Sequence, residues 1–212
     1  MDATVIKQKL IDYTIRQSGA ESRRYLGMSH IADCSRKLFA SLTNIAPALT
    51  WPVESHLRCY AGYLWERDVK ARLAALGLYV PGSERELVAN IDRRFVGHTD
   101  GEISGEKPNE RYLLEIKSTN PDKLQRIIAD KRLPIENYQQ VQVYLRHGGY
   151  SRAYVVYVCR DTGEMHVVEV RPNIRLQADL DYKARRVLDA VDAGQPPKCE
   201  CGRCRQASDQ ER

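Results

Sequence analysis

Residues 95–119 read FVGHTDGEISGEKPNERYLLEIKST, and this stretch decides the fold. Apolar residues alternate along Phe95–Ile103 and again along Arg111–Thr119, which is the pattern of half-buried strands. Between them lies Gly105–Asn109, a segment of glycine, proline and polar residues that is typical of a turn. The stretch therefore predicts two antiparallel strands joined by a short loop.

The predicted pairing brings two carboxylates together. With the turn centred between Lys107 and Pro108, Asp100 lies opposite Glu115, and the Cβ atoms of such a pair are about 4.5 to 5.5 Å apart. Lys117 lies two residues further on and shares the face of Glu115. Carboxylates about 5 Å apart repel each other by roughly 3 kcal/mol at an effective dielectric constant of about 20. A cation between them offsets that repulsion, and such oxygen ligands suit Mg²⁺ or Mn²⁺.

Charged residues on neighbouring strands also occur on ordinary solvent-facing surfaces, and that is the competing interpretation. The segment Leu113–Lys117 argues against it, because its two charges are embedded in an apolar strand where an unpaired charge is costly. The sequence therefore favours a binding or catalytic role for Glu115 and Lys117.

Outside this stretch, helical and strand patterns alternate along the chain. Apolar residues at helical spacing predict helices over 4–18, from an N-cap at Ser29 through Leu42, and over 55–77, 122–130, 135–146 and 173–193. Alternating patterns predict further strands over 87–91, 153–159 and 165–170. This mixture predicts an α/β (α+β) fold in which a central mixed sheet is flanked by helices.

Composition narrows the class of protein. The chain has 212 residues, 42% of them apolar, and a net charge of +5, a mild excess that permits a polyanionic partner without proving one. No stretch approaches the roughly 20 consecutive apolar residues that span a bilayer, and residues 1–17 do not form a signal-peptide core. We therefore expect an intracellular, cytoplasmic protein with no membrane partner.

Four short motifs follow one another in the sequence, each pairing residues that come close on one helix face or one strand. They are Gly62 with Glu66, Gly97 with Asp100, Glu115 with Lys117, and Gln140 with Tyr144. Their order resembles the RecB-like branch of the PD-(D/E)XK nuclease superfamily. The resemblance covers the chain from about Gly62 to Tyr144, and the flanking elements agree in type with that fold.

The resemblance implies roles for these residues. Metal binding falls to Glu66, Asp100, Glu115 and the backbone carbonyl of Ile116. Lys117 would orient the attacking water or help to deprotonate it. Gln140 and Tyr144 would hold the DNA backbone or brace the active site.

Three further residues are candidates for contact with DNA. His98 shares the strand face of Asp100 if residues 95–103 form one strand, which places it within reach of substrate or makes it a packed or solvated imidazole. Arg36 and Lys37 could contact backbone phosphates, and ordinary surface charge is the competing interpretation.

The cysteines cluster at the end of the chain, where Cys199, Cys201 and Cys204 lie within six residues. In a reducing compartment such clustering points to metal, and a fourth ligand must come from another cysteine or a histidine. Cys34 is the candidate, because Cys34–Lys37 resembles a Cys-x-Arg-Lys segment of the iron-sulfur CRISPR-associated RecB-like exonucleases, the fourth Cas family, and of their phage relatives. That resemblance implies a [4Fe-4S] cluster on these four cysteines, clipping the N-terminal helices to the tail. Zinc and an unliganded tail are the alternatives.

Taken together, these features predict a single nuclease domain over residues 1–212. It comprises an N-terminal helical part (1–54), a RecB-like core (55–195) and a cysteine-bearing tail (196–212). The expected function is a Mg²⁺- or Mn²⁺-dependent DNA exonuclease acting on single strands or DNA ends, with recombination, CRISPR-adaptation or phage-replication proteins as partners. The alternatives are a DNA-end-binding or partner-docking module with an unused nuclease pocket, and a structural zinc or cluster protein.

Overall fold

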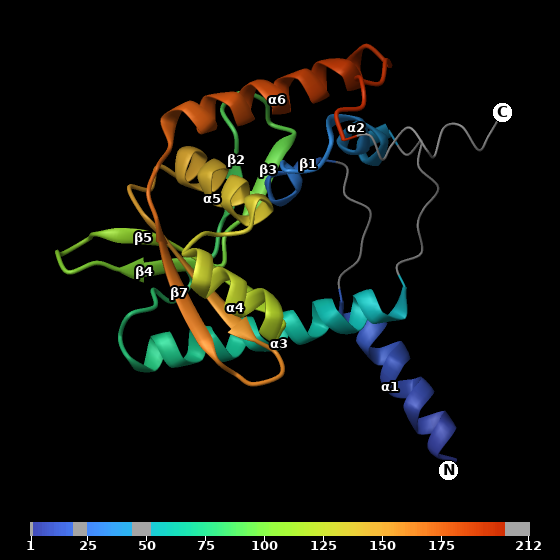
Figure 1. The fold of residues 1–212 in the computed structure, drawn as a ribbon, viewed down its shortest axis with the longest axis vertical. Coiled ribbons are helices and arrows are strands. Elements are labelled where there is room, and N and C mark those ends of the chain that lie inside the picture. The colour runs from blue at the N-terminus through green and yellow to red at the C-terminus, as the bar shows by residue number, and fades with distance from the viewer. Residues whose placement is uncertain (1, 19–24, 44–51, 202–212) are drawn as a thin grey trace.

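The computed structural model describes residues 2–18, 25–43 and 52–201 (Figure 1). Its central sheet has the strand order β4-β5-β6-β7, with β4 and β5 antiparallel, β5 and β6 parallel, and β6 and β7 antiparallel. The four strands are Gly101–Ser104, Arg111–Thr119, Ala153–Cys159 and Met165–Val170. The predicted mixed sheet is thereby confirmed.

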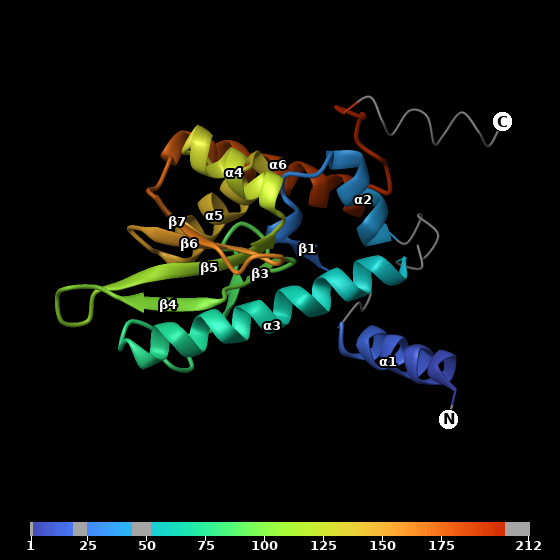
Figure 2. The same cartoon turned by 60° about the horizontal axis from the view of Figure 1, so that its bottom comes forward.

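The parallel pair requires a crossover, and two helices supply it: α4 (Pro121–Asp130) and α5 (Ile135–Gly148). The N-terminus of α4 is capped by Asn120, whose side-chain oxygen accepts a hydrogen bond from the backbone N–H of Lys123 at 2.9 Å. The last long helix, α6 (Ile174–Asp192), packs on α5, so α4, α5 and α6 cover one face of the sheet (Figure 2).

The other face of the sheet is covered by α3 (Val53–Ala75), which begins and ends within two residues of the predicted helix. Successive side chains of β5 alternate between the two faces. Leu114 and Ile116 pack with Val69 of α3, whereas Leu113 belongs to the core under α5 and α6. This alternation also directs Glu115 towards α5, where it is hydrogen-bonded to Gln140.

A second, smaller sheet has the order β1-β3-β2, formed by Leu26–Gly27, Phe95–His98 and Glu86–Val88. The prediction of one continuous strand over 95–103 is wrong, because the chain leaves β3 at His98 and enters β4 of the central sheet at Gly101. Gly101 has φ +132°, and a Cβ there would lie 2.6 Å from the Tyr79 ring. Only glycine fits this bend, so the strand divides there.

The register of the predicted hairpin is confirmed. Gly101 pairs with Leu114 and Glu102 with Leu113, so Asp100 precedes the first pair at the position opposite Glu115. The predicted turn also holds, since the Gly105 N–H donates to the Glu110 carbonyl at 2.9 Å.

The N-terminal part contains α1 (Ala3–Gln17), a 3-10 turn η1 (Met28–His30) and α2 (Ser35–Thr43), which packs on α6. The predicted N-cap at Ser29 is wrong. Met28 and Ile31 are fully buried, and their anchoring in the core holds the chain in a tight turn instead of an α-helix. The helix begins afterwards, where the Cys34 carbonyl accepts from the Leu38 N–H at 3.0 Å. Among the described helices, none is long and apolar enough to cross a membrane.

Candidate active site

A buried carboxylate lies at the centre of the candidate site. Glu115 has a side chain only 2% exposed, and its Oε1 is 2.7 Å from Lys117 Nζ. The same oxygen accepts a hydrogen bond from Gln140 Nε2 at 2.8 Å, while Lys117 donates to Gln140 Oε1 at 3.0 Å. The other oxygen, Glu115 Oε2, is buried and has no hydrogen-bond partner among the described residues. A buried carboxylate oxygen without a partner is costly, so this atom fits a cation ligand.

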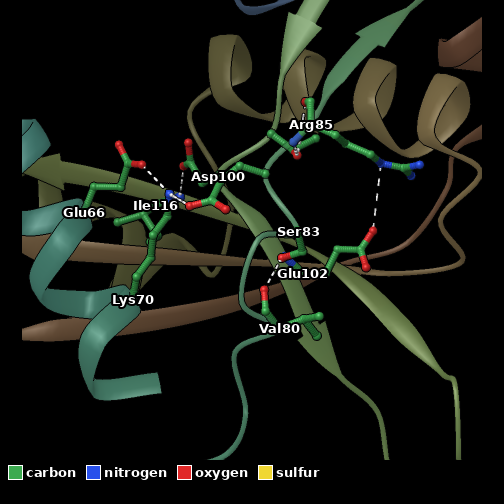
Figure 3. Close-up of polar contacts among 10 residues, drawn as sticks. Glu66, Lys70, Val80, Ser83, Arg85, Asp100, Glu102 and Ile116 are labelled. Carbon is green, nitrogen blue, oxygen red and sulfur yellow. Dashed lines mark hydrogen bonds and ion pairs between the residues drawn. The ribbon is translucent and has the colours of Figure 1, made fainter. Parts of the chain in front are cut away.

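Asp100 adjoins this group from the bend between β3 and β4. Its Oδ2 accepts a hydrogen bond from the backbone N–H of Ile116 at 2.7 Å, which fixes the carboxylate at the edge of β5 (Figure 3). Burial raises the pKa of Asp100 well above its ordinary value, and the negative charges of Glu115 and Glu66 raise it further. The three predicted acids are therefore close enough to repel one another.

The third acid, Glu66, comes from α3 together with a residue that sequence reasoning missed. Lys70 Nζ lies 2.6 Å from Glu66 Oε1 and 3.2 Å from Glu84 Oε1. Burial by itself would lower the pKa of Lys70, but Glu66, Glu84 and Asp100 outweigh it and raise that pKa. Figure 3 shows Lys70 reaching from α3 towards the carboxylates. The signal in the sequence was the spacing of four between Glu66 and Lys70, which places both on one helix face.

Lysines and backbone thus hold the three carboxylates separately. Among the described residues, a single group of three His, Cys, Asp or Glu side chains has all its ligand atoms within 4.8 Å of one another, and that group consists of cysteines. The three acids are neighbours, but their oxygens do not all meet at one point. One ammonium lies beside Glu66 and another beside Glu115. Their all-oxygen donor set, with the unpartnered Glu115 Oε2, fits a hard divalent cation.

The glycines of the first two motifs are positions of close packing. A Cβ at Gly97 would lie 2.5 Å from the Tyr144 ring and 2.8 Å from Met28 Sδ, and one at Gly62 would lie 3.2 Å from Ser118 Oγ. Tyr144 is only 2% exposed, and burial followed by the charge of Glu115 raises its pKa. The burial of Tyr144 suits a bracing residue beneath the carboxylates better than a contact to DNA.

His98 and Asp100 do not lie on one strand, because β3 ends at His98 and Asp100 lies between β3 and β4. His98 ends β3 in the smaller sheet, and its ring nitrogen lies 3.3 Å from the Tyr25 hydroxyl and 3.9 Å from a Glu86 oxygen. The predicted shared face assumed one continuous strand over 95–103, whereas β3 already ends at His98. On α2, Lys37 forms an ion pair with Asp33 at 3.0 Å.

The cysteine cluster joins distant parts of the chain. Cys34 Sγ is 4.0 Å from Cys199 Sγ, and Cys199 Sγ is 3.7 Å from Cys201 Sγ. Burial would raise the pKa of Cys34, but hydrogen bonds, first from the backbone of Glu200, lower it to about 6. The thiolate that metals require is thereby favoured near neutral pH. Cys204, the fourth predicted ligand, lies outside the described residues.

The sulfur separations bear on the kind of metal. Zinc bound tetrahedrally by thiolates at about 2.3 Å places the sulfurs roughly 3.8 Å apart, close to the two separations here. In a [4Fe-4S] cluster each cysteine binds a different iron, which spreads the sulfurs further. Neighbouring contacts hold the cluster to the fold, because Ser35 Oγ donates to Glu200 and Lys183 Nζ donates to the Asp33 carbonyl at 2.7 Å.

Comparison with known proteins identifies similar folds. No protein-family model and no curated protein matches the sequence. The structure is similar to an alkaline exonuclease, LHK-Exo, from Laribacter hongkongensis, with a TM-score of 0.62 and 15% identity over 84% of this chain and 93% of that one. LHK-Exo in complex with dAMP gives a TM-score of 0.63 at the same identity and coverage. SSO0001 gives a TM-score of 0.58 and 16% identity over 86% of this chain and 85% of that one. At these identities the likeness establishes a shared fold.

Proposed function

We propose that this protein is a metal-dependent deoxyribonuclease of the exonuclease type, which hydrolyses phosphodiester bonds of single strands or DNA ends in the cytoplasm. One observation carries the proposal: a buried glutamate oxygen without a partner, Glu115 Oε2, adjoins a second carboxylate and an ammonium. The two carboxylates favour a bound cation, and the ammonium of Lys117 provides a further positive charge beside that cation. The fold shared with an alkaline exonuclease, whose crystal structure with dAMP is known, supports DNA as the substrate.

In the proposed mechanism, Glu66, Asp100, Glu115 and the carbonyl of Ile116 would hold Mg²⁺ or Mn²⁺. When bound, the ion lowers the pKa of a water molecule and neutralises charge on the phosphate. Burial would lower the pKa of Lys117, but Glu115 and Asp100 raise it, so the side chain stays an ammonium. Lys117 therefore donates to the attacking water or to a phosphate oxygen. Gln140 holds both Glu115 and Lys117 in place through its two hydrogen bonds.

We propose that the cysteine cluster holds a second, structural metal centre. The sequence resemblance favours a [4Fe-4S] cluster on Cys34, Cys199, Cys201 and Cys204, whereas the sulfur separations favour a single zinc ion. Metal analysis and the visible spectrum of anaerobically purified protein separate the two, because a brown, oxygen-sensitive sample contains iron-sulfur and a colourless one contains zinc. With either metal, residues 1–212 would act as a single nuclease domain in which the centre links Cys34 to the cysteines that follow α6.

The test of the proposed activity is a nuclease assay on labelled single- and double-stranded DNA with Mg²⁺ or Mn²⁺. Wild type should degrade DNA, and Asp100→Ala and Lys117→Ala should each abolish degradation. Lys107→Ala, in the exposed turn of the same hairpin, serves as the control and should retain full activity. Degradation that survives both active-site substitutions would remove this mechanism.

A DNA-end-binding module with an unused pocket is the second candidate, because the lysines already neutralise two of the acids. It predicts intact DNA in the same assay, together with metal-independent binding that weakens steeply with salt. Recombination, CRISPR-adaptation and phage-replication contexts suit either candidate and would be separated by the partners that copurify with the protein.

A further inference from the structure

A surface hollow of about 600 Å³ lies between α4 and the beginning of α5. Its wall contains basic, acidic and apolar side chains. The lining residues that matter here are Arg126 and Arg132, Asp122 and Asp130, and Leu133 and Pro134. A volume of this size falls within the range of roughly 300 to 1,000 Å³ that is typical of small-molecule pockets.

The two arginines are the first indication of a ligand. Arg126 and Arg132 are exposed, and neither forms a hydrogen bond or ion pair with any residue that the structure describes. Arg94, by contrast, is ion-paired: it lies 2.8 Å from an Asp92 oxygen and 2.6 Å from an Asp192 oxygen. A guanidinium is planar and donates two parallel hydrogen bonds to a phosphate. Two free guanidinium groups on one hollow therefore suit a phosphate.

The position of the hollow is the second indication. In the sheet, Lys117 of β5 pairs with Tyr157 of β6, and the Tyr157 hydroxyl accepts a hydrogen bond from Asn137 Nδ2 at 2.8 Å. Asn137 belongs to the first turn of α5, three residues after Pro134 of the hollow. The hollow and the Glu115–Lys117 group thus lie on the same face of the sheet, the face covered by α4 and α5 (Figure 2).

The other lining residues indicate which further groups of a ligand the hollow could contact. Ile127, Leu133 and Pro134 provide apolar surface, and the carboxylates of Asp122 and Asp130 are hydrogen-bond acceptors. A nucleotide combines a phosphate, a flat base and, in cytosine, adenine and guanine, an amino group that donates to a carboxylate. A plain anion would leave both acids opposed to it, whereas a nucleotide uses all three kinds of group.

We propose that this hollow binds one nucleotide of the DNA strand that passes the carboxylate site, with the phosphate on Arg126 and Arg132. The inference rests on the proposed function, since it assigns a second contact to the same substrate. The hollow would then contact the DNA strand at a nucleotide some distance from the bond that is cut. The site should therefore affect long oligonucleotides and leave a dinucleotide unaffected.

The test is fluorescence anisotropy with labelled oligothymidylates of increasing length, in EDTA so that the strand stays intact. The double variant Arg126→Gln/Arg132→Gln should bind long oligonucleotides roughly tenfold more weakly than wild type. The dependence of log K on log salt should become shallower by about 1.4, for two lost contacts to a single strand. The matched control, Arg175→Gln/Arg186→Gln on α6, removes the same charge from exposed positions and should stay within about twofold of wild type.

The outcomes separate this inference from the proposed function. If wild type binds no DNA in EDTA, the inference fails, whereas the nuclease assay with Mg²⁺ or Mn²⁺ decides the proposed function separately. If wild type binds DNA and the two double variants weaken binding equally, or neither does, the hollow is not a nucleotide site and the proposed function stands. A length-dependent loss confined to Arg126→Gln/Arg132→Gln supports the hollow.

The base contact has its own readout. Oligodeoxycytidylate should bind more tightly than oligothymidylate of the same length, because thymine lacks the amino group that Asp122 or Asp130 would accept. Asp122→Asn/Asp130→Asn should remove the difference between the two oligonucleotides. Equal affinity of wild type for both would overturn the base contact.

Discussion

The three carboxylates and the cysteine cluster differ in the groups that stabilise their negative charges. Around Glu66 and Glu115, side-chain ammonium groups lie 2.6 and 2.7 Å from the carboxylates. Around Cys34, the stabilising groups include backbone N–H donors of Glu200, Arg36 and Cys201. A lysine can move away from its acid, whereas a backbone donor is fixed by the fold.

The two sites also differ in their expected effect on the stability of the fold. The three acids lie within one part of the fold and repel one another, so the protein holds them together at a cost. The cysteines come from positions 165 residues apart, and a metal on them would cross-link α2 to the tail that follows α6. We therefore expect the acids to govern activity and the cysteines to govern stability.

The largest effect is expected on the cysteine side. If the proposed metal is bound, Cys34→Ser should release it and lower the free energy of unfolding by roughly 3 to 5 kcal/mol, because it opens a very long closed loop. Denaturant titration with metal analysis measures both. Cys59→Ser, an exposed cysteine on α3, is the control and should change neither. If Cys34→Ser loses metal but unfolds with unchanged free energy, the cysteine cluster does not stabilise the fold, and the expected contrast with the carboxylates is wrong.

The next effect is an opposite pH dependence of the two sites in metal-free protein. The pKa of Asp100 is raised above its ordinary 3.8, so its contribution to stability is complete below about pH 4 and is lost as pH rises through the folded value. The pKa of Cys34 is lowered from 9.0 to about 6, so its contribution is complete above pH 9 and is lost as pH falls towards 6.

Urea titrations across pH check this prediction against the matching variants. Relative to wild type, Asp100→Asn should become more stable as pH rises above 4, and Cys34→Ser should become less stable between pH 6 and 9. Parallel curves for wild type and either variant would contradict the assigned direction for that residue.

The smallest effect concerns Lys70. Because its ammonium lies 2.6 Å from Glu66, a divalent ion must compete with it, and Lys70→Met should tighten Mn²⁺ binding by about threefold to tenfold. Electron paramagnetic resonance of free Mn²⁺ measures the affinity. Lys37→Met removes a more exposed ion pair between α2 and Asp33, which precedes that helix, and should leave the Mn²⁺ affinity unchanged. Weaker binding in Lys70→Met would show that the lysine positions Glu66 as a ligand.

Local patterns predicted the hairpin, and the reason is physical. A turn centred between Lys107 and Pro108 sets the register of the two strands, so Asp100 comes opposite Glu115. The crossover helices were predictable for the same reason, since apolar spacing and an Asn120 cap are local signals.

Other features escaped prediction because they depend on distant residues. The strand break at Gly101 depends on the Tyr79 ring, which packs against it from the segment after α3. The turn that replaces a helix after Ser29 depends on the burial of Met28 and Ile31 in the core. Neither the approach of the Tyr79 ring nor the burial of Met28 and Ile31 can be inferred from the local sequence pattern.

The sequence by itself determined most element types, the hairpin register and the order of the acidic motifs, because each depends on spacing within a few residues. Tertiary structure decided which charges meet. It brought Lys70 to Glu66 and Glu84, gathered Cys34 with Cys199, and placed Arg126 and Arg132 beside a hollow with no ion-pair partner among the described residues. Electrostatic interactions weaken with distance and depend on burial, and both quantities exist only once the chain has folded.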